Sequence, residues 1–305
     1  MAEENETDEK TASAEDPALQ DDDREDETDE DIDEEDVPLS FCHACLTPFE
    51  QFYYLGEKNG FSLVSCLQCT TAVADPYPTV EFMEKYFEKF KKPSPKSEEV
   101  EKAATRHLKT IQKLQEKTKG KRFLSVGCGY GYSVIAAHSA ELEAYGIDVE
   151  EKPIKLAKKN LGKEYFRRIS VEDYAAGGKQ ADIVYIAESQ IFECALDPNA
   201  FAAALKKILA PGGVIYLDIL DGNHFMVPSN FIRWKDVKPP VTLHYFSRKG
   251  IKILLERHGL EVERFKFRFR TRMSFTAVHA SEKTAKDKKP AKNDGKKSEK
   301  KDAAA

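Results

Sequence analysis

Short apolar runs alternate with helical stretches through the second half of the chain. The runs lie at 122–126, 144–147, 182–186 and 214–220, and the helical stretches lie near 131–140, 152–160 and 199–209. This alternation favours a parallel sheet with helices on both faces. A helix at Arg248–His258 follows, and then a strand at Glu261–Arg270 in which phenylalanines alternate with basic residues. We therefore predict an α/β fold over residues 120–280.

The residues before this region predict smaller elements. Two apolar runs, Phe52–Leu55 and Phe61–Val64, flank a glycine-containing turn and predict a β-hairpin. Apolar residues then recur at helical spacing in Val80–Phe90, which has a candidate N-cap at Thr79, and in Ser97–Lys117. We interpret 79–119 as a helical linker.

Charge is distributed unevenly along the 305 residues, although the net charge is only −6. Residues 1–38 hold 20 acidic and 2 basic side chains, and residues 281–305 hold 9 lysines against 5 acidic residues. Both tails lack the apolar content that would offset the entropy of ordering, so we expect them to be disordered. The sequence contains neither an apolar stretch of about 20 residues nor a basic, apolar leader. We expect a soluble, cytoplasmic protein without a membrane span.

Four of the six cysteines form two Cys-x2-Cys pairs with 20 residues between them. Each pair places two thiols on one tight turn, and two such turns supply the four ligands of a tetrahedral zinc ion. Because the hairpin lies between the pairs, we predict a zinc ribbon over 39–78 with a structural Zn2+. The alternatives are reduced cysteines without metal, and His43 as a replacement ligand. The predicted ligands are Cys42, Cys45, Cys66 and Cys69.

A glycine-rich turn follows the first run of the α/β region. It reads Gly127-Cys128-Gly129-Tyr130-Gly131, and Asp148 ends the next run 21 residues after Gly127. Such glycines let the backbone approach a ligand, and a carboxylate at that position can accept both hydroxyls of a ribose. Tyr132 stands where the dinucleotide fingerprint has glycine, which disfavours NAD. The alternative is a structural turn followed by a surface aspartate.

At these residues the sequence resembles the class I S-adenosylmethionine-dependent methyltransferases. The resemblance rests on 124–131, 145–148, 181–184 and the Leu-x-Pro-Gly-Gly turn at 209–213. It implies a Rossmann-like fold with a mostly parallel seven-stranded sheet and helices on both faces. The ribbon, with Asp75-Pro76-Tyr77-Pro78 and His244-Tyr245-Phe246-Ser247, is similar to a subfamily linked to methylation of sugars, glycans or other small molecules.

Carried over by position, the resemblance implies a cofactor site at the ends of the first, second and fourth strands. The chain departs from the family at Ser125 and Ser170, where acidic residues are usual, and neither serine can supply a charge to the cofactor. The implied cofactor-binding residues are Ser125, Gly127, Cys128, Gly129, Gly131, Asp148, Val149, Val171, Glu172 and Glu188.

The acceptor is expected to be a small molecule or a nucleotide-linked sugar, methylated on oxygen, nitrogen or carbon. We hypothesise that His244 is the catalytic base and that 223–241 covers the acceptor pocket. One alternative is a nucleic-acid or protein methyltransferase that docks through the ribbon, although the acidic tail would repel nucleic acid. Another is a binding module that retains the fold without catalysis.

Overall fold

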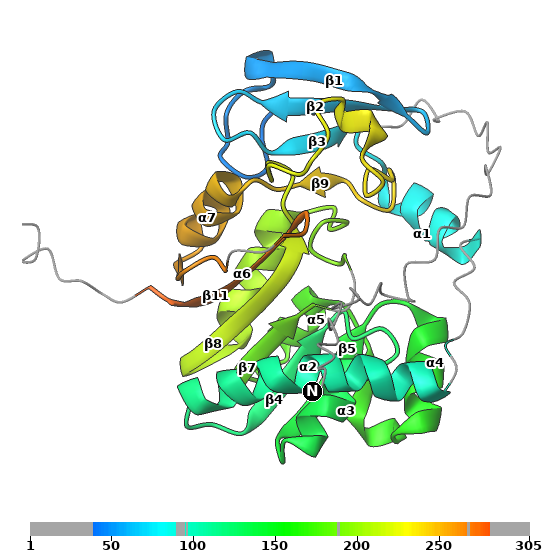
Figure 1. The fold of residues 1–305 in the computed structure, drawn as a ribbon, viewed down its shortest axis with the longest axis vertical. Helices are drawn as coiled ribbons and strands as arrows, with labels where there is room; N and C mark the ends of the chain where they lie inside the picture. The colour runs from blue at the N-terminus through cyan, green and yellow to red at the C-terminus, as the bar shows by residue number, and fades with distance from the viewer. Residues whose placement is uncertain (1–38, 90–94, 96, 188–189, 267–268, 281–305) are drawn as a thin grey trace, which may run out of the picture.

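The computed structural model describes residues 39–280, apart from 90–94, 96, 188–189 and 267–268 (Figure 1). Both predicted tails therefore lie outside the described residues. A larger sheet lies in the lower part of Figure 1 and a smaller sheet in the upper part. Among the helices of the described residues, none has both the length and the apolar character that a membrane span needs.

Seven strands form the larger sheet. They are β4 (Arg122–Val126), β5 (Glu143–Asp148), β6 (Phe166–Arg168), β7 (Ala181–Ile186), β8 (Leu209–Leu220), β10 (Leu260–Val262) and β11 (Arg272–His279). Their order is β10-β11-β8-β7-β4-β5-β6. The five strands from β8 to β6 in this order run parallel, whereas β11 is antiparallel to β8 and β10 is antiparallel to β11. The predicted mostly parallel seven-stranded sheet is thus confirmed.

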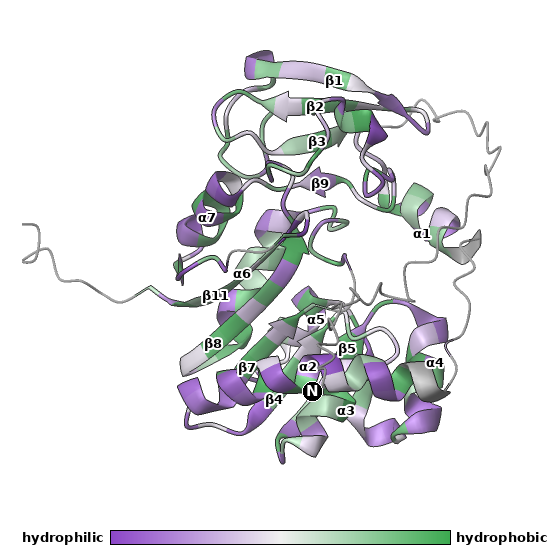
Figure 2. Ribbon diagram, viewed as in Figure 1, coloured by the Kyte–Doolittle hydropathy of each residue, from purple (hydrophilic) through white to green (hydrophobic). Residues whose placement is uncertain are grey.

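Helices cover both faces of this sheet because alternate residues of each strand point to opposite sides. One set is α2 (Ser97–Lys117), α3 (Tyr132–Ser139) and α4 (Glu151–Asn160), and the other is α5 (Val171–Ala176), α6 (Pro198–Ile208) and α7 (Arg248–Arg257). In β4, Phe123 packs with residues of the first set and Leu124 with residues of the second. Hydrophobic positions dominate β7 and β8 in Figure 2, while hydrophilic positions run along α2 and α4.

The smaller sheet joins two segments that are distant in sequence. Its strands are β1 (Phe52–Lys58), β2 (Phe61–Cys66), β3 (Ala72–Asp75) and β9 (His244–Tyr245), in that order. The predicted hairpin is confirmed as β1 and β2. Trp234 and Tyr245 share a hydrophobic cluster with Phe61 and Leu63, so the segment after β8 packs onto the hairpin.

The two helices predicted before the α/β region are present as α1 (Val80–Lys89) and α2. The Thr79 Oγ1 accepts a hydrogen bond from the Phe82 N–H at 3.1 Å, as expected of an N-cap. The sequence pattern missed β6 and α5, because three and six residues are too few to show a period.

The predicted antiparallel strand at Glu261–Arg270 is confirmed at its start but is too long, and its residues 267–268 lie outside the described residues. Within it only Glu261 and Val262 belong to β10, and Phe269 is 76% exposed rather than buried. After Val262 the pairing with β11 becomes irregular: the Glu263 N–H donates to the Thr276 carbonyl at 2.8 Å, and Lys266 forms an isolated bridge with Ser274. Phe265 also packs on Phe275 at a ring distance of 4.8 Å. Alternation indicates a half-buried surface, but it does not show where the pairing of a strand with its neighbour becomes irregular.

Candidate functional site

The glycine-rich turn between β4 and α3 presents its backbone to open space. Gly127, Gly129 and Gly131 have φ angles of 68°, 48° and 85°, in the region that favours glycine. A Cβ on Gly131 would lie 2.7 Å from Phe166 Cζ, so this residue also allows close packing. A Cβ on Gly129 would meet no atom within 4 Å. The turn therefore has the form of a backbone cradle with an open side.

Asp148 lies at the end of β5, directly beside this cradle. Its Oδ2 accepts a hydrogen bond from the Gly129 N–H at 2.8 Å, and its Oδ1 accepts one from the Glu150 N–H at 2.9 Å. The residue is only 4% exposed. Since each carboxylate oxygen has two lone pairs, Asp148 can hold the turn and still accept ligand hydroxyls. The structure thus brings the predicted glycines and the predicted aspartate together.

The other predicted cofactor contacts divide into exposed and buried side chains. Val149 is 50% exposed, and Glu172 is exposed at the start of α5. Cys128 and Val171 are buried instead, and a Cβ on Gly146 would lie 2.7 Å from Cys128 Sγ. These two side chains belong to the cores on either face of the sheet, so only their backbone can face a ligand.

The two serines that depart from the family pattern both have local partners. The Ser133 hydroxyl donates to Ser125 Oγ at 2.8 Å, and both residues are buried. Ser170 caps α5: its Oγ accepts from the Asp173 N–H at 3.0 Å and donates to Asp173 Oδ2 at 2.9 Å. The spacing Ser-x-x-Asp is a capping signal that could have been found in the sequence.

The segment that follows β7 contains a residue that the sequence analysis missed. Glu188 lies outside the described residues, but Glu193 is fully buried. Its Oε1 accepts from the Leu220 N–H at 2.8 Å, and burial raises its pKa to about 7 although Arg272 opposes the shift. Nothing in the sequence marks this glutamate, because its burial comes from elements distant along the chain.

His244 lies in β9 and is 1% exposed. Its Nδ1 is 3.3 Å from the Glu193 carbonyl oxygen, and its Nε2 is 2.9 Å from Nδ1 of His43 and 3.2 Å from the Tyr77 hydroxyl. Burial lowers the pKa of His244 to about 3, and the neighbouring His43 adds to this effect. A base needs a ring nitrogen that faces the acceptor, whereas both nitrogens of His244 face protein groups. We therefore do not assign it as the base.

Comparison with known proteins identifies the family to which this architecture belongs. A family model described as a methyltransferase domain matches residues 98–264. The chain belongs to this methyltransferase family. The match begins in α2 and ends after β10, so the ribbon and α1 lie outside it.

Relatives of the methyltransferase domain are found among characterised proteins. The ubiquinone biosynthesis O-methyltransferase of Bordetella avium (strain 197N) is 33% identical over 130 residues, which are 41% of this chain and 52% of the relative. The protein of the same name from Thiobacillus denitrificans is 35% identical over 109 residues, 34% of this chain and 46% of the relative. The chain thus spans about half the length of the curated relatives that it matches. Among solved structures, DesVI of Streptomyces venezuelae has a TM-score of 0.49 and 16% identity, covering 59% of this chain and 93% of that chain.

Two surface hollows border the methyltransferase domain. One, of about 630 Å³, lies on the α5 side of β5 and contains neither Asp148 nor the 127–131 turn. The other, of about 430 Å³, lies where the second cysteine pair, the segment after β8 and the start of α7 meet. Its lining includes Asn223, His224 and Phe225, from the segment predicted to cover an acceptor pocket.

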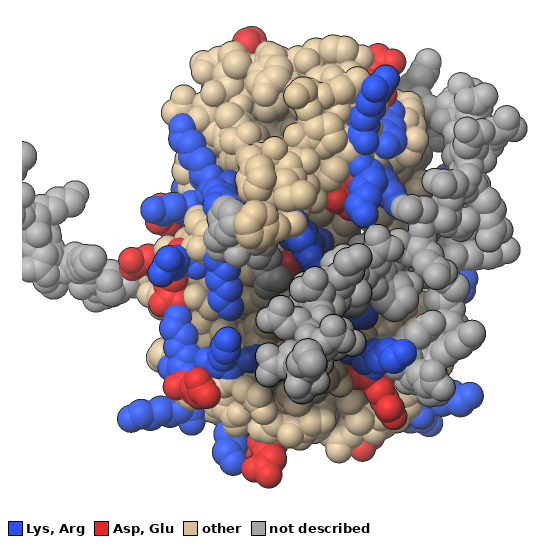
Figure 3. Space-filling view, in the orientation of Figure 1, with Lys and Arg blue, Asp and Glu red and all other residues tan. Residues whose placement is uncertain are grey.

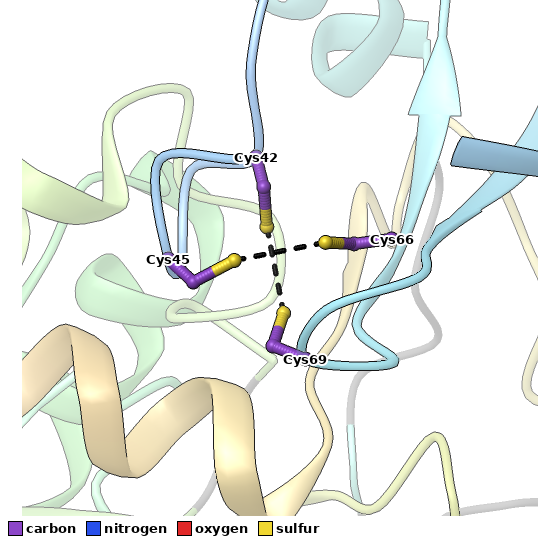
Figure 4. A group of neighbouring side chains, drawn as sticks. All are labelled: Cys42, Cys45, Cys66 and Cys69. Carbon is purple, nitrogen blue, oxygen red and sulfur yellow. Dashed lines mark hydrogen bonds between the residues drawn. The ribbon is translucent and has the colours of Figure 1, made fainter. Parts of the chain in front are cut away.

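The four paired cysteines converge at the junction between the ribbon and α7. Their Sγ atoms all lie within 4.8 Å of one another, and the Cys42–Cys69 and Cys45–Cys66 sulfurs are each 3.6 Å apart (Figure 4). Sulfurs around a tetrahedral zinc at the usual bond length are separated by about 3.8 Å. The hydrogen bond between Cys42 and Cys69 raises the pKa of the Cys42 thiol and lowers that of the Cys69 thiol. Donor type and spacing therefore fit zinc.

Proposed function

We propose that this chain transfers the methyl group of S-adenosylmethionine to an oxygen of a small-molecule acceptor. The observation that carries the proposal is the Asp148 carboxylate beside Gly129, within a chain that belongs to a methyltransferase family. This pairing offers a ribose-binding carboxylate and a backbone cradle at the carboxyl ends of adjacent parallel strands, where ligands bind in such sheets.

Each part of the cofactor can be given to residues of this chain. The backbone of 127–131 would cradle the methionine end, Asp148 would hold the ribose hydroxyls, and Val149 would pack on adenine beside Glu172. Ser125 has no charge to offer the cofactor, so it would contribute through the buried hydrogen bond that its hydroxyl accepts from Ser133. When bound, S-adenosylmethionine supplies a methyl group activated by a sulfonium sulfur. The chain's contribution is then mainly orientation, which is worth on the order of 7–11 kcal/mol.

The choice of an oxygen acceptor follows the relatives, which are named O-methyltransferases. A small-molecule acceptor also fits these relatives, whose name places them in ubiquinone biosynthesis. Hydroxyl-bearing nucleotide sugars and phenols are therefore the first two classes for an acceptor screen.

We further propose that Cys42, Cys45, Cys66 and Cys69 hold one structural zinc ion. Four thiolates complete a tetrahedral shell, so no coordination position would remain for an acceptor. The convergence of the four Sγ atoms supports this assignment.

The ribbon's charge does not favour docking to nucleic acid. Residues 39–78 contain one lysine against three acidic residues. The ribbon surface visible in the upper part of Figure 3 is mostly uncharged. Nucleic-acid binding depends on neutralising phosphates with Lys and Arg, so we prefer the small-molecule assignment.

Calorimetric titration with S-adenosylmethionine and S-adenosylhomocysteine tests the cofactor assignment. We expect micromolar binding in the wild type, weakened about 10- to 100-fold in Asp148→Asn because charged hydrogen bonds to the ribose are lost. Glu150→Gln, which makes the same charge change two residues away, should bind like the wild type. Absence of binding at millimolar ligand, or equal affinity in Asp148→Asn, would reject the proposal.

A further inference from the structure

The first cysteine turn carries a histidine whose side chain reaches out of the ribbon. His43 lies between Cys42 and Cys45, and its Nδ1 is 2.9 Å from His244 Nε2. Its ring also packs edge-to-face on Tyr77 with a centroid distance of 4.8 Å. His43 therefore connects the cysteine site to β9, 201 residues further along the chain.

The direction of these hydrogen bonds follows from the groups involved. The Glu193 carbonyl can only accept, so the neutral His244 ring carries its proton on Nδ1 and donates it there. His244 Nε2 is then an acceptor, and the His43 Nδ1–H donates a hydrogen bond to it. The same carbonyl also accepts the N–H groups of Leu243 and His244, at 3.1 and 2.9 Å. A continuous path thus runs from the cysteine turn to Glu193.

Glu193 belongs to residues 190–197, between β7 and α6, and β7 lies on the side of β4 away from β5 and its Asp148. Parallel sheets bind their ligands at the carboxyl ends of the strands, and this segment follows directly on such an end. The ribbon contacts it at a second point, because the Tyr77 hydroxyl donates to the Ala195 carbonyl at 3.1 Å. Gln190, nearer to β7, accepts from the Thr242 hydroxyl at 2.6 Å.

The helices of the larger domain hold the first cysteine turn in place. Asn199 Nδ2 donates to the His43 carbonyl at 3.2 Å, and Arg257 Nη1 donates to the Ala44 carbonyl at 2.9 Å. Arg257 Nη2 also donates to Asn199 Oδ1 at 2.8 Å, so the two side chains brace each other. With its backbone anchored in this way, the turn can fix the direction of the His43 ring.

We infer that His43 is a positioning residue through which the metal-loaded cysteine site holds residues 190–196 in the arrangement that receives the methyl acceptor. This inference rests on the proposed methyl transfer. It makes the ribbon a support for the acceptor side of the site rather than a docking module. Cofactor affinity, which depends on Asp148 and the 127–131 turn, should be insensitive to His43.

The test compares two substitutions of His43 in zinc-loaded protein. His43→Phe keeps an aromatic ring but loses the hydrogen bond, whereas His43→Asn retains an N–H near the Nδ1 position. Leu67→Ser, in the second cysteine turn and 61% exposed, is the matched control. Zinc content, affinity for S-adenosylhomocysteine, hydrogen exchange of residues 190–196 and the acceptor KM are measured for each protein.

His43→Phe should retain one zinc and the wild-type cofactor affinity. Its 190–196 amides should exchange about 3- to 10-fold faster, and its acceptor KM should rise by a similar factor, as expected for one lost hydrogen bond. His43→Asn and Leu67→Ser should resemble the wild type. Unchanged exchange in His43→Phe, or loss of its zinc, would overturn the inference. Absence of cofactor binding in the wild type would instead reject the proposed function, since the exchange comparison needs no cofactor.

Discussion

Glu193 is a glutamate whose surroundings shift its protonation. The carboxyl group is fully buried, and its Oε2 has no hydrogen-bond partner among the described residues. Burial therefore favours the protonated form, and the pKa rises to about 7 even though Arg272 opposes the shift. A glutamate of this kind costs stability whenever it is ionised in the folded protein.

Glu193→Gln should accordingly change the pH dependence of stability. The folded-state pKa is about 7 against an ordinary value of 4.5, so the wild type loses stability as pH rises through this interval. The glutamine of the variant cannot ionise, so the free energy of unfolding of the variant should not fall for this reason. Relative to the variant, the free energy of unfolding of the wild type should fall by about 2–3 kcal/mol from pH 5 to pH 8. Urea unfolding at both pH values measures this difference, and parallel pH profiles would contradict the explanation.

The helix α7 contacts the ribbon at both of its cysteine turns. Ser247 caps it by accepting from the Gly250 N–H at 2.8 Å, and the same hydroxyl donates to the Cys69 carbonyl. A Cβ on Gly250 would lie 2.0 Å from Thr71 Oγ1 and 3.4 Å from Ala44 Cβ. The absence of a side chain at Gly250 thus allows the first turn of α7 to contact both cysteine turns.

Gly250→Ala should destabilise the protein although alanine is the better helix former. The favourable propensity term is about 1 kcal/mol, and we expect overpacking against Thr71 to exceed it, for a net loss of about 1–2 kcal/mol. Thr71→Ala should recover part of this loss in the double variant, because it removes the atom that the new methyl group meets. A double-mutant cycle by urea unfolding measures the coupling. Strictly additive effects would show that the contact with Thr71 is not the cause.

At the scale of the whole molecule, the ribbon and the methyltransferase domain share a hydrophobic core. Cys42, Cys66 and Cys69 belong to the same buried cluster as Phe246 and Leu254, and that cluster continues into the larger sheet. The predicted ribbon (39–78) and methyltransferase domain (120–280) are therefore separate in the sequence but share one core. We propose that the two parts unfold together.

Removal of zinc should lower the stability of the entire chain rather than that of the ribbon alone. A structural zinc contributes apparent binding energy of about 10–16 kcal/mol, comparable to the stability of a whole domain. Thermal unfolding with and without chelator, followed by circular dichroism, should show a single transition that shifts downward. Cys194→Ser should keep one zinc per chain, since Cys194 is not among the four converging cysteines. Two separate transitions, with the upper one unaffected by chelation, would show that the parts are independent.

The sequence by itself determined the features that depend on short-range patterns. Apolar spacing marks α2 and the central strands, the Cys-x2-Cys pairs mark the cysteine site, and the turn at 127–131 followed by Asp148 marks the cofactor side. Each of these signals lies within a few residues or in one strand–turn–helix unit, so the physics that creates it is local.

Only the tertiary structure decided how these parts act on one another. It placed His244 against His43 and away from solvent, and it buried Glu193 between segments distant along the chain. It also ended β10 at Val262, after which the pairing with β11 continues only as single contacts such as the bridge between Lys266 and Ser274. Burial, pKa and strand pairing depend on neighbours brought together by folding, which is why local patterns identified the chemical groups but not the environments in which they work.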